Sequence, residues 1–393
     1  MIAGVSRLLS FENRVAILLA TLMLGINVLS VSSHLGFLHK PKQVKELDHW
    51  RYIEMAKGSE ARPSLARQST YCWRVFTPFA ARLLYRAGLS MNLAFFVVSN
   101  VFLFAFLLAV WAYLAALGLG LASRATGLVL VGLTQGAVRW YEYQYWMTDP
   151  PSLFLLVLAL LLVRQERLLP LFPLGAVAAL VREHNVVVVP FQWLHALKRG
   201  VPFLRATAVA ASLSLLPIAV LVGLRLLIAP VDQGDMLADM VDTLGFRWRH
   251  REDQLYQLSV GSLGVVFPLL LLLPSRVPGM IRRNLDSLSV VAFFYGLLLV
   301  ANNTEREIAY ALPVLLPAAL IQLRDYAREA RLPALPLAAL VVALQALFFR
   351  EQRFLDAGSS MYQPTNMTVV AAMLAFWLAA QATLRVRRRA TTA

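Results

Sequence analysis

The chain has 393 residues, of which 59% are hydrophobic and only 15% are charged, and its formal net charge is +15. This composition excludes one or two soluble domains of ordinary make-up and indicates a polytopic membrane protein. The positive charge does not predict nucleic-acid binding, because the Lys and Arg residues fall in short clusters between apolar runs, as topology signals do. Cys72 is the only cysteine, which excludes an intrachain disulfide and a cysteine metal site.

The apolar runs predict an all-α polytopic bundle of about twelve membrane spans. A run that follows Arg7 and Arg14 is expected to be a retained signal-anchor helix. In chain order, the runs cover residues 15–33, 92–117, 122–139, 151–163, 168–181, 185–197, 206–229, 260–274, 287–301, 308–323, 333–349 and 367–384. No long linker divides the chain, so we expect a single transmembrane domain, 1–393, with extracytoplasmic loops at 34–91 and 231–259.

The basic clusters predict the orientation of these spans. They place both termini in the cytoplasm and most acids on the outer side, in a bacterial inner membrane. The region 168–197 is the ambiguous part, because a single helix of that length would extend about 45 Å, beyond a hydrocarbon core of about 30 Å. We therefore expect two short spans that turn at Arg182, Glu183 and His184.

The first outer loop is the most informative segment. It carries Asp48 near its start, and a carboxylate at the water-facing end of a helical bundle suits acid/base chemistry at a membrane surface. Its second half, residues 73–86, spaces apolar and basic side chains at three and four residues, which predicts an interfacial helix that covers the bundle. Packing alone would explain that helix equally well, whereas a functional interpretation assigns Arg74 or Arg82 to a lipid phosphate.

The pattern Asp48-x-x-x-Tyr52-x-x-Met55-Ala56, followed by a Pro-containing interfacial helix and a long second span, resembles the GT-C superfamily of integral-membrane glycosyltransferases. The likeness covers mainly residues 10–165 and includes the protein O-mannosyltransferase and aminoarabinose-transferase branch. It implies that an acid of the first outer loop, here Asp48, is the catalytic base and that the donor is a polyprenyl-phosphate sugar. One departure is that His49 stands where the branch often has a second acid.

From these placements we expect an enzyme with three catalytic acids and six substrate-binding residues on the outer side. The acids are Asp48, Asp149 and Glu183, and the substrate-binding residues are Tyr52, Arg74, Arg182, His184, Arg306 and Tyr310. Arg74, Arg182 and Arg306 are expected at the donor phosphate. A divalent metal is compatible with clustered acids, but two arginines would neutralise the same charge, so the sequence leaves metal dependence open. The expected partners are the lipid-linked donor, an acceptor of unspecified identity and membrane lipids.

Several of these residues also have a purely structural explanation. Asp149 precedes two prolines and is expected to cap a helix, a role compatible with a substrate-facing one. The residues Tyr141, Tyr143, Tyr145 and Trp146 are expected to form an interfacial aromatic belt. His250 is expected to be exposed.

Two other functions fit the sequence less fully. A twelve-span secondary transporter matches the span number and the cytoplasmic termini, but the loop at 120–127 lacks the acid and repeated basic residues of the major facilitator pattern. A lipid-linked-glycan ligase or polymerase would use an outer-loop Arg and His, such as Arg249 and His250. The structured outer loop 34–91 favours the glycosyltransferase.

Overall fold

The computed structural model describes residues 10–44, 48–69, 71–231, 236–298, 304–351 and 364–392. The chain is 82% helical, and no strand occurs in these ranges, which confirms the all-α expectation. Four helices are long and apolar enough to cross a membrane, namely Phe11–Leu35, Met91–Ala116, Phe203–Leu227 and Asn366–Ala390. A fifth candidate is the pair Leu121–Gly132 and Gln135–Tyr143, which is bent by 64°.

Each of the twelve apolar runs contains helix within the described residues. Most of these helices are shorter than the roughly 20 residues of a perpendicular crossing, so twelve spans stay a prediction. The predicted outer loop at 231–259 contains two helices, α13 (Met236–Arg249) and α14 (Arg251–Tyr256), and its residues 232–235 lie outside the described residues.

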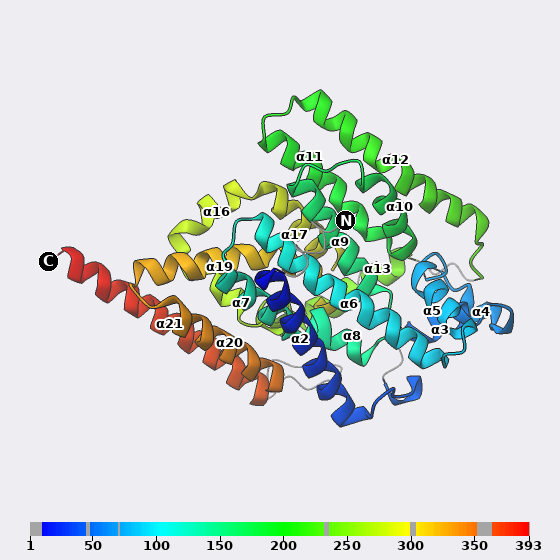
Figure 1. Cartoon of the computed structure of the whole chain (residues 1–393), viewed down its shortest axis with the longest axis horizontal. Coiled ribbons are helices and arrows are strands. Elements are labelled where there is room, and N and C mark those ends of the chain that lie inside the picture. Colours follow the sequence, from blue (N-terminus) through cyan, green and yellow to red (C-terminus); the bar gives the residue numbers. More distant parts are fainter. Residues whose placement is uncertain are drawn as a thin grey trace. The chain divides into compact units, whose positions relative to one another are not determined.

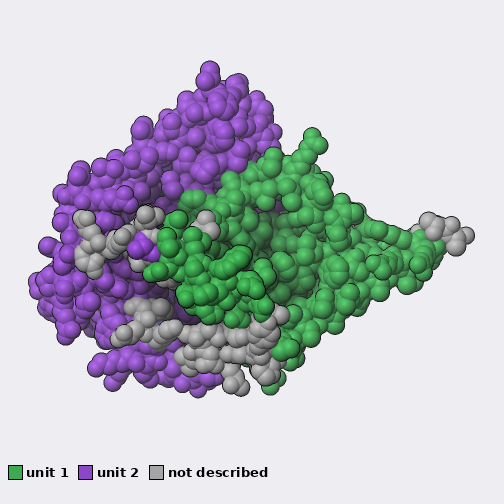
Figure 2. Space-filling model, turned by 180° about the vertical axis from the view of Figure 1, so that it is seen from behind, with its two compact units in different colours: residues 1–19, 118–137, 240–393 green, residues 20–117, 138–239 purple. Residues whose placement is uncertain are grey.

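The chain groups into two compact units, each built from discontinuous segments (Figure 2). The first unit comprises residues 1–19, 118–137 and 240–393, and the second comprises 20–117 and 138–239. No linker in the sequence marks this grouping. The chain passes between the units inside the apolar runs 15–33 and 122–139, at the end of the run 92–117, and within α13.

The first unit is built mainly from helices of the second half of the chain, together with α7 (Leu121–Gly132). Those of the second half include α15 (Val266–Leu270), α16 (Val277–Arg283), α17 (Leu285–Leu297), α18 (Thr304–Ala309), α19 (Leu312–Glu329), α20 (Ala334–Glu351) and α21 (Pro364–Thr392). Gln345 of α20 joins two of the segments, since its amide accepts from the Val265 N–H at 2.9 Å and donates to the Leu133 carbonyl at 3.0 Å.

The second unit contains the loop 34–91, which the sequence predicts to lie outside, and four consecutive helices after residue 148 (Figure 1). The long helices are α6 (Met91–Ala116), α9 (Asp149–Arg164), α10 (Leu171–Val181), α11 (Val188–Lys198) and α12 (Phe203–Leu227). The loop folds into α3 (His49–Lys57), α4 (Pro63–Ala66) and α5 (Phe76–Arg86), and α8 (Trp140–Tyr143) precedes α9.

The region 168–197 doubles back, as the sequence predicts. The start of α9 contacts Arg182, through its ion pair with Asp149, and the end of α9 contacts α11, through Arg164 and His195 at 3.0 Å. Since α9 has 16 residues and is thus about 24 Å long, α10 must run antiparallel to α9, from its end back to its start. Helix α11 then runs parallel to α9. Arg182 has extended backbone (φ −158°, ψ 135°), which ends α10 at the turn.

Helix α5 matches the interfacial helix predicted at 73–86. It exposes Phe79 and Leu83 and packs against α3 and α6 with its other face. The preceding helix α3 ends at Gly58, whose φ of 65° is a left-handed value that favours glycine. The guanidinium of Arg82 lies where a Gly58 side chain would begin, so the two loop helices meet at this glycine.

Candidate active site

Four chain segments of the second unit meet at one end of its helices. The segment after α2 (Phe11–Leu35) joins the segment before α9, since His39 Nε2 contacts the Tyr143 carbonyl at 2.9 Å and the Tyr145 hydroxyl donates to the His39 carbonyl at 2.6 Å. The loop helices join the end of α12, since Trp73 Nε1 donates to the Ile228 carbonyl at 3.2 Å. The predicted outer segments of this unit therefore share one end.

Arg74 connects the outer loop to the turn between α10 and α11. Its guanidinium donates to both oxygens of Glu183, at 2.6 and 3.2 Å, and to the Tyr52 hydroxyl at 3.3 Å. Burial opposes ionisation of Glu183, but Arg74 outweighs it and holds the pKa of that carboxyl well below its usual range. The side chain of Glu183 is 43% exposed, whereas that of Arg74 is only 10% exposed.

Arg182 pairs with Asp149 rather than with its neighbour Glu183. The two side chains are 4% and 0% exposed, so this ion pair is buried. The predicted capping role of Asp149 is wrong: Thr148 occupies the N-cap position of α9, and the Asp149 carboxylate instead accepts from Arg182. The carboxylate in the first turn of α9 thus pairs with a guanidinium from the turn after α10, a partner that the local sequence pattern does not reveal.

His184 extends this polar cluster along α9. Its Nε2 lies 3.2 Å from the Ser152 hydroxyl oxygen, which also accepts from the Asn185 side chain at 2.9 Å. All three residues are buried. The turn residues thus hold η4 (Glu183–Val187) against α9. Among the polar residues 182–185, Glu183 alone has a substantially exposed side chain.

Asp48 lies at the wall of an open cavity of about 770 Å³ in the outer loop. This volume is in the range of small-molecule sites. The cavity is lined by Lys42, Asp48, Trp50, Arg51, Glu54, Lys57, Arg62, Leu65 and Tyr71. Most of these side chains are polar, in contrast to the rest of the unit.

Arg51 orients the Asp48 carboxylate. One Asp48 oxygen is 3.1 Å from the Arg51 guanidinium, which also donates to the Gln68 side chain and lies 4.4 Å from the centre of the Tyr71 ring. Burial and the nearby Asp48 charge raise the pKa of Tyr71 to about 12, so Tyr71 is a neutral hydrogen-bonding group. Arg51 and Tyr71 are site residues that local sequence patterns did not single out.

Glu54, the acid within α3, is held by two hydrogen-bond donors. Its carboxylate accepts from Lys57 at 2.6 Å and from the Arg62 backbone N–H at 2.8 Å. Burial alone would raise the pKa of Glu54, but these two donors lower it below its usual value. This carboxylate closes the turn between α3 and α4, so Asp48 is the better candidate for proton transfer.

His49 does not replace the second acid of the GT-C pattern. Its ring is buried 5.3 Å from that of Trp50 and 5.4 Å from that of Trp146, and burial lowers its pKa to about 4. The imidazole is therefore neutral at physiological pH. The predicted aromatic belt is also wrong, because Tyr145 and Trp146 pack inside against His39 and are buried together with Tyr141 and Tyr143.

Arg306 and Tyr310 belong to the first unit. The Arg306 Nε atom lies 3.8 Å from a Glu307 oxygen in α18, and the Tyr310 ring stacks on Phe294 at 5.0 Å. Their substrate-binding roles, and a shared phosphate for Arg74, Arg182 and Arg306, stay predictions. His250, predicted to be exposed, is exposed at the end of α13.

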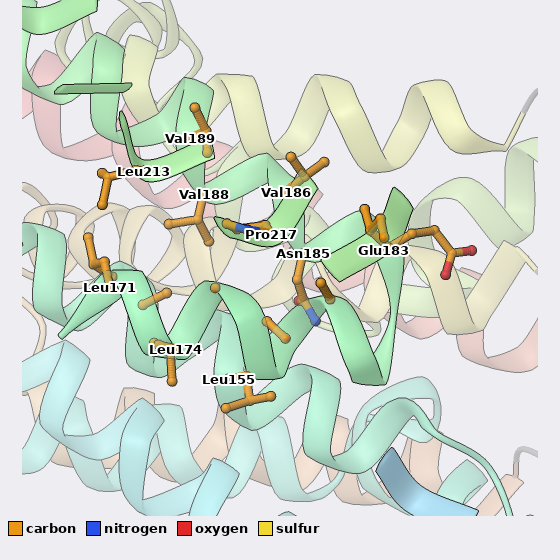
Figure 3. A pocket seen from close by; sticks show the side chains of 15 residues that line it. Leu155, Leu171, Leu174, Glu183, Asn185, Val186, Val188, Val189, Leu213 and Pro217 are labelled. Carbon is orange, nitrogen blue, oxygen red and sulfur yellow. The ribbon is translucent and has the colours of Figure 1, made fainter. Parts of the chain in front are cut away.

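An apolar crevice of about 40 Å³ opens among α9, α10, α11 and α12. Figure 3 shows Leu171 and Leu213 at one end and Glu183 at the other, with the Glu183 carboxylate directed away from the leucines. Leu155 and Leu174 line the wall between them. The crevice thus leads from an apolar interior to the Arg74–Glu183 pair.

The described residues contain no group of three His, Cys, Asp or Glu side chains placed to hold a metal ion. A scan against protein-family models finds no match for this chain, and a search of curated proteins finds no significant relative. Functional inference therefore rests on the site itself.

Proposed function

We propose that the protein is a membrane glycosyltransferase that uses a polyprenyl-phosphate sugar and Asp48 as general base. The observation that carries the proposal is the cavity of about 770 Å³ in the outer loop, with Asp48 on its wall. A general base needs access to a bound hydroxyl and a fixed orientation. The cavity supports the first requirement and the Asp48–Arg51 contact supports the second.

Arg74 is the better candidate than Arg182 for the donor phosphate. The partner of Arg74, Glu183, is 43% exposed and displaceable by another anion, whereas the partner of Arg182 is fully buried. Arg74 also approaches Glu183 through two nitrogens, the geometry with which a guanidinium binds a phosphate.

The reaction is a displacement at the anomeric carbon. Asp48 removes the proton of an acceptor hydroxyl while the oxygen forms a bond to that carbon. The bond from the carbon to the lipid phosphate breaks, the electron pair leaves with the phosphate, and Arg74 stabilises the developing charge. A single displacement inverts the anomeric configuration.

The proposal includes a topology of about twelve spans, with both termini in the cytoplasm of a bacterial cell and the Asp48 cavity outside. The convergence of the loop 34–91 with the Asp149 and Glu183 segments supports a common side for these three elements. Labelling of single cysteines near Glu60 in intact cells would agree with this orientation, whereas labelling only after permeabilisation would contradict it.

A donor-binding experiment tests the proposal. Purified protein is incubated with a panel of polyprenyl-phosphate sugars and analysed by native mass spectrometry, and each retained donor is then assayed for transfer. We expect wild-type protein to retain at least one donor and Arg74→Gln to retain less of it. Failure of the wild-type protein to bind or use any polyprenyl-phosphate sugar would contradict the proposal.

One observation favours a proton-coupled transporter as the second candidate. Glu142, in the bent helix pair 121–143, is 2% exposed and accepts a hydrogen bond from Asn100 at 3.3 Å, but makes no ion pair with any cation in the described ranges. Buried acids in broken membrane helices often carry coupled protons. Proton-driven solute uptake by proteoliposomes that Glu142→Gln abolishes and Asp48→Asn spares would favour this function.

A further inference from the structure

The charges around the Asp48 cavity do not balance. Among the described residues that line it, four cations, Lys42, Arg51, Lys57 and Arg62, face two acids, Asp48 and Glu54. Two of the cations are already matched, because Arg51 pairs with Asp48 and Lys57 pairs with Glu54. The cavity therefore carries a surplus of positive charge.

Lys42 and Arg62 supply that surplus. Neither side chain forms an ion pair with an acid in the described residues, and both are exposed. The Arg62 backbone N–H holds one oxygen of Glu54 and Lys57 holds the other; the charge of Arg62 also lowers the pKa of Glu54, although the Arg62 side chain forms no ion pair with it. Both cations are consequently available to a ligand, and a concave surface with excess positive charge concentrates anions.

We infer that the cavity binds an acceptor saccharide or polyol that carries a carboxylate or phosphate, which Lys42 and Arg62 receive while a hydroxyl of the same molecule faces Asp48. This inference rests on the proposed transfer reaction for the role of the hydroxyl, but not for the binding of the anion. The acceptor's anionic group and its hydroxyl have separate roles: the anionic group is bound, and the hydroxyl reacts. A guanidinium and an ammonium can each donate hydrogen bonds to a carboxylate or to a phosphate.

The arrangement also predicts which acceptors are rejected. An amino sugar would place a positive charge beside two cations, and a neutral sugar would leave them unmatched. The electrostatic preference acts at an exposed surface, so it should weaken as salt shortens the screening length. Lys42 and Arg62 are thus specificity-determining residues, distinct from the base.

Binding of matched sugars to the full-length protein tests this inference. Methyl glucoside is the neutral probe, methyl glucuronide carries a carboxylate, and glucose 6-phosphate carries a phosphate; isothermal titration calorimetry in nanodiscs measures each affinity. We expect at least one anionic probe to bind about tenfold tighter than the neutral one at low salt, equivalent to about 1.4 kcal/mol. The comparison of glucuronide with glucose 6-phosphate identifies the preferred anion.

The double variant Lys42→Gln/Arg62→Gln should abolish the preference, and the control variant Arg86→Gln should keep it, because Arg86 is an exposed cation of α5 outside the cavity. Equal or undetectable binding of charged and neutral probes by the wild type, or an undiminished preference in the double variant, would overturn the inference.

Asp48→Asn separates this inference from the proposed function. It should retain the anion preference while losing transfer. If it retains both, the anion site stands and the role of Asp48 as base is refuted. If it loses transfer while the wild type shows no anion preference, the base stands and the anion site is refuted.

Discussion

Replacing Arg182 with methionine should destabilise the protein by about 3–5 kcal/mol. Arg182 and Asp149 are 4% and 0% exposed, so removal of the guanidinium leaves a buried carboxylate without its ion-pair partner. That loss is a large fraction of a typical unfolding free energy of about 5–15 kcal/mol. Methionine keeps most of the side-chain length, which limits the additional effect of an unfilled cavity.

The assay is equilibrium unfolding in mixed micelles, analysed as a double-variant cycle. Asp149→Leu/Arg182→Met removes both charges and should be more stable than Arg182→Met alone, because no buried charge remains unmatched. The exposed Arg86→Met is the control and should change stability by less than about 0.5 kcal/mol. A loss below about 1 kcal/mol for Arg182→Met, or a double variant less stable than either single variant, would refute the buried ion pair.

Three further outcomes are expected in the outer loop. Burial lowers the pKa of His49 to about 4 in the folded protein, against 6.5 in model peptides. As the pH falls from 6.5 to 4, the unfolded state therefore takes up a proton before the folded state does, and the free energy of unfolding should decrease by on the order of 3 kcal/mol. Unfolding measured over this pH range would contradict the expectation if His49→Phe showed the same decrease. Gly58→Ala should destabilise by about 1–3 kcal/mol, since φ is 65° and ψ is −111° there; an unchanged melting temperature would argue against that backbone. Arg74→Lys should raise the donor KM severalfold with little loss of stability, because lysine cannot make a bidentate contact with the phosphate. An unchanged KM would show that Arg74 does not bind the donor phosphate.

The positions of the helices could be predicted from the sequence because apolar runs, and the Pro, Gly and charged residues that end them, are local signals. A helix within 73–86 was expected from the residue spacing and occurs as Phe76–Arg86, while its position at a membrane interface stays a prediction. The turn at Arg182 was expected from helix length and the positive-inside pattern, and α10 ends there.

The partners of the charged side chains could not be predicted in this way. Arg74 and Glu183 are 109 residues apart, and Asp149 and Arg182 are 33 apart, so only packing decides which pairs form. The aromatic residues before α9 were misplaced for a related reason. An alternation of tyrosines and polar residues fits a membrane interface, but here the rings pack on His39, whose place is set by the preceding segment.

The most direct test of the account is the rate of sugar transfer by Asp48→Asn, measured with a donor that the wild-type protein uses. Glu60→Gln is the matched control, since Glu60 is an exposed acid of the same loop outside the cavity. We predict that Asp48→Asn lowers the rate about 10²- to 10⁴-fold at unchanged melting temperature, whereas Glu60→Gln does not. Turnover by Asp48→Asn within about threefold of the wild type, well short of the loss expected for a general base, would contradict the central claim.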